Sequence, residues 1–155
     1  MPSKPEARIK ELNLVLPIPP KPMAKYRTAV FVEPMLYLSG HAPLTPDGKV
    51  AMTGRVGGDL TLEQGKEAAR LTGLAILSTV RNTLGSLDKV KRLVKTLGFV
   101  NCTNDFKDQP LVINGFSELM AEVFGDEAGV GARSAVGTNA LPAGIPVEIE
   151  CIFEV

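Results

Sequence analysis

The chain has 155 residues, and its 17 Lys and Arg balance its 17 Asp and Glu, so the formal net charge is zero. This length predicts a single core, and a hydrophobic fraction of 45% excludes disorder as the main state. A neutral chain has no overall positive field to hold a phosphate backbone, so we expect no nucleic acid as the main partner.

The cysteines, the histidine and the apolar stretches of the chain predict the compartment of the protein and restrict the metal sites it can form. Cys102 and Cys151 lie far apart without a CxxC spacing, which fits a reducing compartment. His41 is the sole histidine, so a histidine-rich metal site is excluded. Charges interrupt the apolar stretches before the roughly 20 residues of a membrane span, and residues 1–10 show no signal-peptide pattern. We therefore expect a cytoplasmic protein without membrane contact.

The first 40 residues predict an arm followed by a β-hairpin. Helix-forming residues fill positions 5–14, and four prolines between positions 17 and 22 predict an extended connector. Two β-rich runs at 28–32 and 35–40 are separated by Glu33-Pro34, which predicts a hairpin. We expect residues 1–23 to form a helix and a proline-rich arm, and residues 24–155 to form a single domain.

A long helix and a long strand come next in the chain. Thr61 and Gln64 have the spacing of a capping box, which satisfies two free N–H groups at a helix start. Apolar residues then recur at spacings of three and four until Gly85, which predicts a helix over about residues 62–84. The β-formers at 89–100 predict one long strand.

The C-terminal third predicts a second helix and two strands. Asp108 is placed to cap the helix, Pro110 fits its first turn, and Gly125 ends it. The strands are predicted at about 132–137 and 146–155.

The predicted elements give an α+β fold with a mixed sheet and two helices packed on one face. The last strand alternates, so that Glu148, Glu150 and Glu154 point away from its apolar side. Nothing in the sequence covers the other face of the sheet, and self-association is the simplest cover.

Three familiar motifs fail. Gly65-Lys66 lacks the preceding glycine of a phosphate-binding loop and falls inside the predicted helix. Ser39 and His41 have no carboxylate placed to orient the imidazole, so a serine hydrolase is disfavoured and His41 is interpreted as a polar strand-end residue. The basic run at positions 89–95 is better explained as a solvated strand or turn than as an RNA site.

Several segments form a distinctive series along the chain. The C-terminal ones are Ala132-Arg133-Ser134, Leu141-Pro142 and Val147-Glu148-Ile149-Glu150, and the earlier ones are Leu38-Ser39-Gly40, Asn104-Asp105-Phe106 and Ile113-Asn114. In this order they resemble the YjgF-type Rid family of reactive imine and enamine deaminases, also labelled the L-PSP endoribonuclease family. The resemblance covers roughly residues 24–155.

The resemblance implies a chorismate-mutase-like fold, a homotrimer and a cleft at each subunit interface, with no metal or organic cofactor. It implies a deaminase of the 2-iminobutanoate/2-iminopropanoate type, which hydrolyses 2-iminoacids derived from 2-aminoacrylate to 2-ketoacids and ammonia. One alternative is a non-catalytic trimer that binds small carboxylates or a partner protein in the same cleft. A ribonuclease or translation inhibitor is a weaker alternative for a neutral chain with eight aromatic residues.

Arg133 and Glu148 are the candidate catalytic residues that the resemblance implies. A guanidinium offers two parallel N–H donors that match the carboxylate of a 2-iminoacid. A carboxylate near the substrate can deprotonate the attacking water and then protonate the departing nitrogen. The alternative for Arg133 is an ion pair with Glu148 or Glu150 that only joins two strands, and the alternative for Glu148 is a solvated strand glutamate.

Three further residues match family positions that bind substrate. Tyr26 is a candidate lid, or else a half-buried aromatic residue. Ser39 either donates a hydrogen bond to the substrate or simply ends a strand. Asn114 lies off the apolar stripe of its helix, so it either reaches the cleft or faces solvent.

The chain departs from the family pattern by a longer N-terminal arm, by extra residues before Asn114 and by substitutions at three places. Ala135 stands where many members have cysteine, His41 where they have glutamine, and Ala24-Lys25 where they have Gly-Pro. These departures bear on the size and preference of the substrate.

Overall fold

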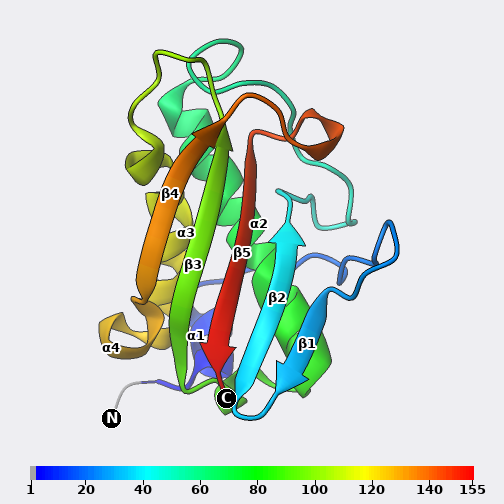
Figure 1. Cartoon of the computed structure of the whole chain (residues 1–155). Coiled ribbons are helices and arrows are strands. Elements are labelled where there is room, and N and C mark those ends of the chain that lie inside the picture. The colour runs from blue at the N-terminus through cyan, green and yellow to red at the C-terminus, as the bar shows by residue number, and fades with distance from the viewer. Residues whose placement is uncertain (1–2) are drawn as a thin grey trace.

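The computed structural model describes residues 3–155, which form a five-stranded mixed sheet with helices on one side (Figure 1). Met1 and Pro2, part of the predicted arm, lie outside the described residues. The elements are α1 (Pro5–Glu11), β1 (Ala29–Val32), β2 (Met35–His41), α2 (Leu62–Leu84), β3 (Arg92–Asn101), α3 (Gln109–Phe124), α4 (Asp126–Gly129), β4 (Ala132–Thr138) and β5 (Val147–Glu154), with 3₁₀ turns at Leu87–Lys89 and Pro142–Gly144.

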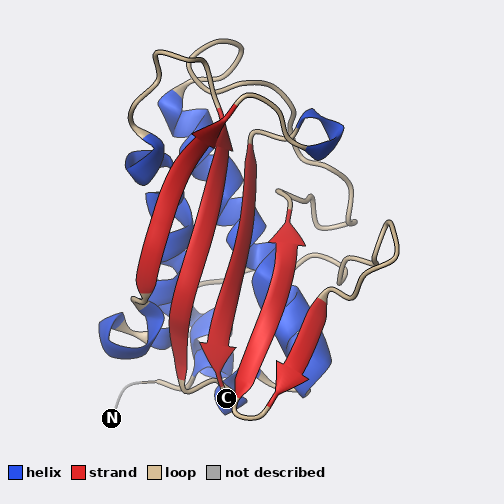
Figure 2. Cartoon of the chain, viewed as in Figure 1, coloured by secondary structure: helices blue, strands red, loops and turns tan. Residues whose placement is uncertain are grey.

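The strands lie in the order β1-β2-β5-β3-β4, so β1 and β4 are the two edges of the sheet. Strand β4 runs parallel to β3, and the other neighbouring strands are antiparallel. Figure 2 shows the helices behind the sheet and the other face of the sheet uncovered. The predicted α+β fold is confirmed.

Helices α2 and α3 bury the helix-bearing face of the sheet. On β5, Val147, Ile149 and Phe153 are fully buried, while Glu148 and Glu150 alternate with them and point to the other face. Helix α2 has the predicted bounds because its local signals suffice: Gln64 N donates to Thr61 Oγ1 at 3.2 Å, and Thr61 N donates to Gln64 Oε1 at 2.9 Å.

Two predicted boundaries and one predicted capping hydrogen bond are wrong. Strand β3 begins at Arg92, because the Ser86 side chain caps a 3₁₀ turn that buries Leu87. Asp108 occupies the N-cap position of α3, but its side chain makes no capping hydrogen bond. Helix α1 ends at Glu11, before the predicted end at position 14. Asn13 adopts a left-handed φ of 52°, which is typical of a residue just after a helix end.

The N-terminal arm lies on the helix-bearing side of the sheet. Glu6 accepts two hydrogen bonds from the Arg81 guanidinium, at 2.6 and 3.1 Å, and one from Leu87 N at 2.9 Å. Further along, Ser78 Oγ of α2 donates to Pro17 O at 2.6 Å. These contacts keep the arm against the helices and away from the open face.

The open face of the sheet carries apolar side chains that the chain does not cover. Val30, Val32, Tyr37 and Val136 are between 42% and 59% exposed. An apolar face of this kind marks an interaction surface. Among residues 3–155, none of the helices combines the length and apolar character that crossing a lipid bilayer requires.

Candidate functional site

Arg133 lies on the edge strand β4 and reaches the first turns of α3. Its Nη1 donates to Asn114 Oδ1 at 2.9 Å and to Ser117 Oγ at 3.1 Å, and its Nη2 donates to Pro110 O at 3.2 Å. The guanidinium is therefore held on the helix-bearing side of the sheet. We call Arg133, Asn114 and Ser117 the arginine half-site.

The positive charge of Arg133 has only neutral partners. Among residues 3–155, no carboxylate oxygen lies within 4.0 Å of the guanidinium nitrogens. The alternative of an ion pair with Glu148 or Glu150 is wrong, because β3 separates the two strands and both glutamates point to the open face. An oriented, uncompensated guanidinium is suited to bind an anion.

Glu148 lies on the open face, packed over the backbone of Gly40 on β2. A Cβ at Gly40 would lie 2.8 Å from Glu148 Cδ and 3.1 Å from Glu148 Oε1, so a side chain at this position would displace the carboxylate. Burial, and then the charge of Glu150, raises the pKa of Glu148 above the ordinary value of 4.5. This is the direction that a general base working near neutral pH requires.

Ser39 and Tyr26 lie at the same end of the sheet as Glu148. Ser39 immediately precedes Gly40, and its Oγ donates to Arg27 O at 2.5 Å. Tyr26, the neighbour of Arg27, is 46% exposed, and its hydroxyl accepts a hydrogen bond from Met23 N at 3.4 Å. We call Glu148, Ser39 and Tyr26 the glutamate half-site.

The two half-sites do not meet within one chain. Arg133 and Asn114 are in contact on one side of the sheet, and Glu148 points to the other side, two strands away. A single site that uses both Arg133 and Glu148 therefore needs a second copy of the chain.

A polar hollow of about 460 Å³ lies where β3 and β4 end, next to the start of α3. Its lining residues are Cys102, Thr103, Asn104, Phe106, Gln109, Gly137, Thr138 and Asn139. Gln109 is followed in the chain by Pro110, whose carbonyl accepts a hydrogen bond from the Arg133 guanidinium, but no residue of the arginine half-site lines the hollow.

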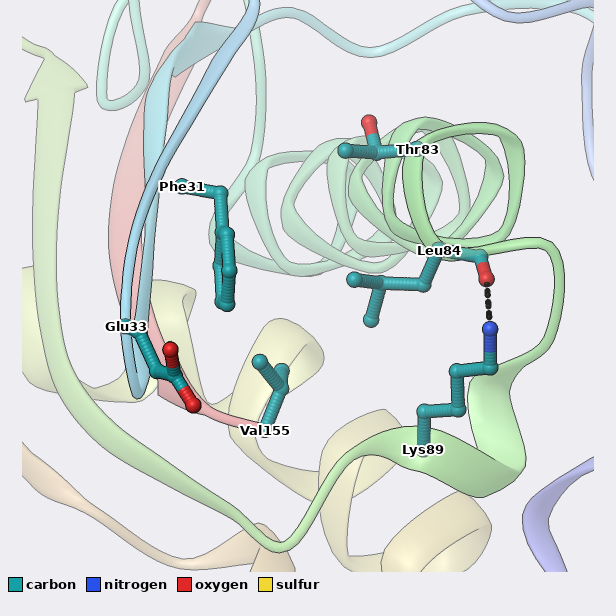
Figure 3. Close-up of a pocket in the computed structure, with 6 residues that line it drawn as sticks. All are labelled: Phe31, Glu33, Thr83, Leu84, Lys89 and Val155. Carbon is teal, nitrogen blue, oxygen red and sulfur yellow. Dashed lines mark hydrogen bonds between the residues drawn. The ribbon is translucent and has the colours of Figure 1, made fainter.

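A larger cavity of about 500 Å³ lies beside the opposite edge of the sheet, between β1 and the end of α2 (Figure 3). Apolar side chains of Phe31, Leu84 and Val155 form its walls. Lys89 at its rim donates to Leu84 O at 2.7 Å, which satisfies a carbonyl at the helix end. No candidate site residue from the sequence lines this cavity.

His41 is a buried residue at the end of β2, as the strand-end interpretation expects. Its Nδ1 donates to Ser39 O at 2.6 Å, and its Nε2 accepts from Thr79 Oγ1 at 2.8 Å. Burial lowers the pKa of the imidazole, so the ring is neutral at physiological pH. Within residues 3–155, no cluster of three potential His, Cys, Asp or Glu ligands is placed to hold a metal ion.

Two contributors to the site were not identified from the sequence. Ser117 lies three residues after Asn114, a spacing that places both on the same side of α3, so helical periodicity could have found it. The close approach of Glu148 to Gly40 depends on the register between β2 and β5, which no local pattern shows.

Comparison with known proteins identifies relatives along nearly the whole chain. Residues 6–153 match the family model described as "YjgF/chorismate mutase-like, putative endoribonuclease". Protein TCP17 of Trypanosoma cruzi is 40% identical over 148 residues, covering 96% of this chain and 92% of that protein. The structure of Atu1372 from Agrobacterium tumefaciens, a protein described as of unknown function, superposes with a TM-score of 0.89 at 41% identity, covering 97% and 92% of the two chains. The YjgF gene product of Escherichia coli superposes with a TM-score of 0.63 at 28% identity, covering 88% and 92%.

Proposed function

Because the chain belongs to the YjgF/chorismate mutase-like family, we propose that it hydrolyses reactive 2-iminoacids to 2-ketoacids and ammonia. The observation that carries the proposal is the Arg133 guanidinium, which three neutral acceptors orient and no carboxylate of residues 3–155 neutralises. The substrate class is a small molecule with a carboxylate next to a C=N bond.

Arg133 would bind the substrate carboxylate through two parallel N–H donors. The anion replaces water on a guanidinium whose other hydrogen bonds already fix its plane. This orientation holds the imine carbon in a defined position, which lowers the entropic cost of the attack by water. Asn114 acts in this scheme as a positioning residue for Arg133.

Glu148 would act as the general base and then as the general acid. It takes a proton from water as the water oxygen bonds to the imine carbon, and the C=N bond becomes a C–N bond. Glu148 returns that proton to nitrogen, which gives a carbinolamine. It then takes the hydroxyl proton as the C–O bond becomes C=O and passes it to the nitrogen as the C–N bond breaks, so ammonia leaves and the ketone forms. Its raised pKa makes Glu148 a stronger base toward the water proton than an ordinary glutamate.

The two half-sites would meet between copies of the chain in a homotrimer. Edge strand β4 carries Arg133, and the uncovered sheet face carries Glu148 and exposed apolar residues. Packing β4 and the start of α3 of one copy against the open face of the next would cover these apolar residues and create one cleft per interface.

A coupled assay tests the proposal. A dehydratase that releases the enamine supplies the 2-iminoacid, and ketoacid formation is followed above the spontaneous rate. Glu148→Gln should slow turnover by about 10² to 10⁴, because the amide can hold water but cannot accept its proton. Glu150→Gln is the matched control on the same strand and face, and it should retain most of the activity. Equal rates for the parent and Glu148→Gln would contradict the assignment.

Two alternatives give different results in the same experiments. A non-catalytic carboxylate-binding trimer would bind a 2-ketoacid through Arg133 but give no acceleration. An endoribonuclease, the activity in the family description, would degrade RNA in an Arg133-dependent manner. We expect no such degradation, because two side chains of the basic run are engaged within the chain: Lys95 donates to Ser134 Oγ at 3.1 Å, and Arg92 lies 3.6 Å from Glu154.

A further inference from the structure

We propose that the free edge of β1 binds an extended peptide of a partner protein. The peptide adds a strand to the five-stranded sheet and places one apolar side chain in the cavity between β1 and the end of α2. It carries a basic residue two positions before this apolar residue. The inference is independent of the proposed deaminase function, because it uses neither the arginine half-site nor the glutamate half-site.

The backbone of β1 leaves hydrogen-bonding groups free at the edge of the sheet. Ser39 N of β2 donates to Thr28 O at 3.0 Å, so these two residues form a hydrogen-bonded pair. In an antiparallel ladder such pairs alternate with pairs that do not bond to each other, and Ala29 and Phe31 belong to the second kind. Their N–H and C=O groups therefore point away from β2, and no other segment of residues 3–155 donates to or accepts from these backbone groups.

The side chains of β1 do not obstruct a further strand. Val30, Phe31 and Val32 are exposed, and no charged residue, proline or bulge interrupts Ala29–Val32. Charges, prolines and bulges are common means by which edge strands resist pairing. The strand has only four residues, so its two outward-facing residues offer about four hydrogen bonds. A bound strand therefore needs a further anchor.

The cavity beside β1 provides this anchor. Phe31 and Glu33 line it from the strand and Leu84 lines it from the end of α2, with Val155 between them (Figure 3). Phe31 lies on the helix-bearing face of the sheet, because its register partner Leu36 is fully buried in the core. The residue of an added strand that lies opposite Phe31 has its side chain on this same face, next to the cavity. A volume of about 500 Å³ is ample for a leucine, methionine or phenylalanine side chain.

Glu33 determines the charge that the peptide should carry. Among residues 3–155, no cationic nitrogen lies within 4.0 Å of its carboxylate. Lys89 lies across the cavity and donates to Leu84 O instead (Figure 3). Glu33 follows Phe31 by two positions and lines the same cavity, so in an antiparallel peptide the residue opposite Glu33 comes two positions before the apolar anchor. Opposite charges in directly facing positions stabilise a strand pair, so this residue should be basic.

A second copy of the chain fits this edge less well than such a peptide. If two β1 strands pair with Arg27 of the second copy opposite Glu33, the residue opposite Phe31 is Ala29, whose methyl group leaves the cavity unfilled. If Phe31 faces Phe31, the residue opposite Glu33 is Ala29, which carries no charge. The proposed trimer uses β4, the start of α3 and the open face, and none of these lines the cavity.

A fluorescein-labelled peptide, Thr-Arg-Thr-Leu-Thr-Thr with a C-terminal amide, tests the proposal by fluorescence anisotropy. We expect saturable binding with a Kd below about 1 mM. Replacing the leucine by alanine should weaken binding about tenfold, because the cavity then loses its apolar occupant. Replacing the arginine by glutamate should weaken binding about three- to tenfold.

Glu33→Lys tests the register by exchange of charge. It should weaken binding of the arginine peptide and strengthen binding of the glutamate peptide, each by about three- to tenfold. Glu67→Lys is the matched control, because it makes the same change of charge at an exposed position of α2 away from the cavity. It should leave both affinities unchanged.

Ala29→Pro tests the use of the backbone. It removes an outward N–H that bonds to nothing within residues 3–155, so it should abolish binding while the melting temperature stays near that of the parent. Ala29→Ser keeps the N–H and should bind as the parent does. If Ala29→Pro does not fold, the charge exchange at Glu33 still decides.

Three results would overturn the inference. The first is no binding at about 1 mM protein, and the second is equal affinity for the leucine and alanine peptides or for the arginine and glutamate peptides. The third is a doubled mass of the parent in light scattering without peptide that Ala29→Pro halves, since the edge would then belong to a second copy.

Discussion

Glu148 determines how activity should depend on pH. Its carboxylate is the reactive form, and burial together with Glu150 raises its pKa above 4.5. The acidic limb of the kcat/KM profile should therefore lie above that of an ordinary glutamate. Glu150→Gln removes the second of these causes, so it should move the limb to lower pH. A pH profile of the two proteins measures this, and an unmoved limb would show that the limb belongs to another group.

The same raised pKa sets the sign of a stability effect. The folded chain holds the Glu148 proton to higher pH than the unfolded chain, so the free energy of unfolding falls as pH rises from the ordinary value through the raised one. Glu148→Gln removes this loss of free energy of unfolding, so at pH 7 the melting temperature of the variant should be no lower than that of the parent. Activity and melting temperature then move separately, as expected for a group placed for chemistry rather than stability.

Arg133 should behave as a binding residue in substitution experiments. Arg133→Ala should weaken binding of the substrate carboxylate by factors of about tens to thousands, and Arg133→Lys should recover part of this because it restores charge but not the planar fork. Because Arg133 lies at an edge strand with neutral partners, both variants should remain assembled. Turnover and thermal unfolding measured on the same preparations decide this, and a destabilised Arg133→Lys with full activity per folded chain would contradict the clamp.

At the level of elements, the sequence predicts best where signals are local. The capping box and Gly85 determine α2, and alternation on β5 predicts which glutamates leave the core. The 3₁₀ turn before β3 depends on burial of Leu87 and has no such signal. Edge strand β4, Ala-Arg-Ser-Ala-Val-Gly-Thr, lacks apolar alternation, so only the tertiary structure shows that Arg133 faces α3.

At the crossing of α2 and α3, close helix packing and intrinsic helix propensity predict opposite effects of one substitution. Alanine is the better helix former by about 1 kcal/mol, so propensity alone predicts that Gly115→Ala stabilises the protein. A Cβ at Gly115, however, would lie 2.0 Å from Lys66 O, a backbone atom that can move only with its helix. We expect a loss of about 1 to 3 kcal/mol in denaturant unfolding.

Gly73→Ala is the matched control for that crossing. Its Cβ would meet the flexible side chain of Leu119 at 2.8 Å, which can rotate away, so the loss should be smaller than for Gly115→Ala. Similar losses for the two variants would mean that the helices separate easily and that the approach at Gly115 is not a constraint.

At the level of the whole molecule, the uncovered sheet face and the divided site point to the same assembly. Val30, Val32 and Tyr37 leave an apolar surface on the face that carries Glu148. Arg133 lies on the opposite side of the sheet at an edge. A closed ring of three copies would use a head-to-tail interface, in which each copy contributes a different half-site to each of its two neighbours.

Mixing two inactive variants tests this arrangement directly. Arg133→Ala retains the glutamate half-site, and Glu148→Gln retains the arginine half-site. If each site takes Arg133 from one copy and Glu148 from the next, random 1:1 trimers contain a complete site at roughly a quarter of their interfaces. Co-refolding the two variants should then restore roughly a quarter of the parent activity, although each variant refolded alone stays inactive. Light scattering on the same samples must give a trimer mass. If mixed trimers form but no activity returns, Arg133 and Glu148 belong to separate sites. The reason is that any mixed ring whose sites join Arg133 of one copy to Glu148 of the next has at least one interface at which both residues are intact.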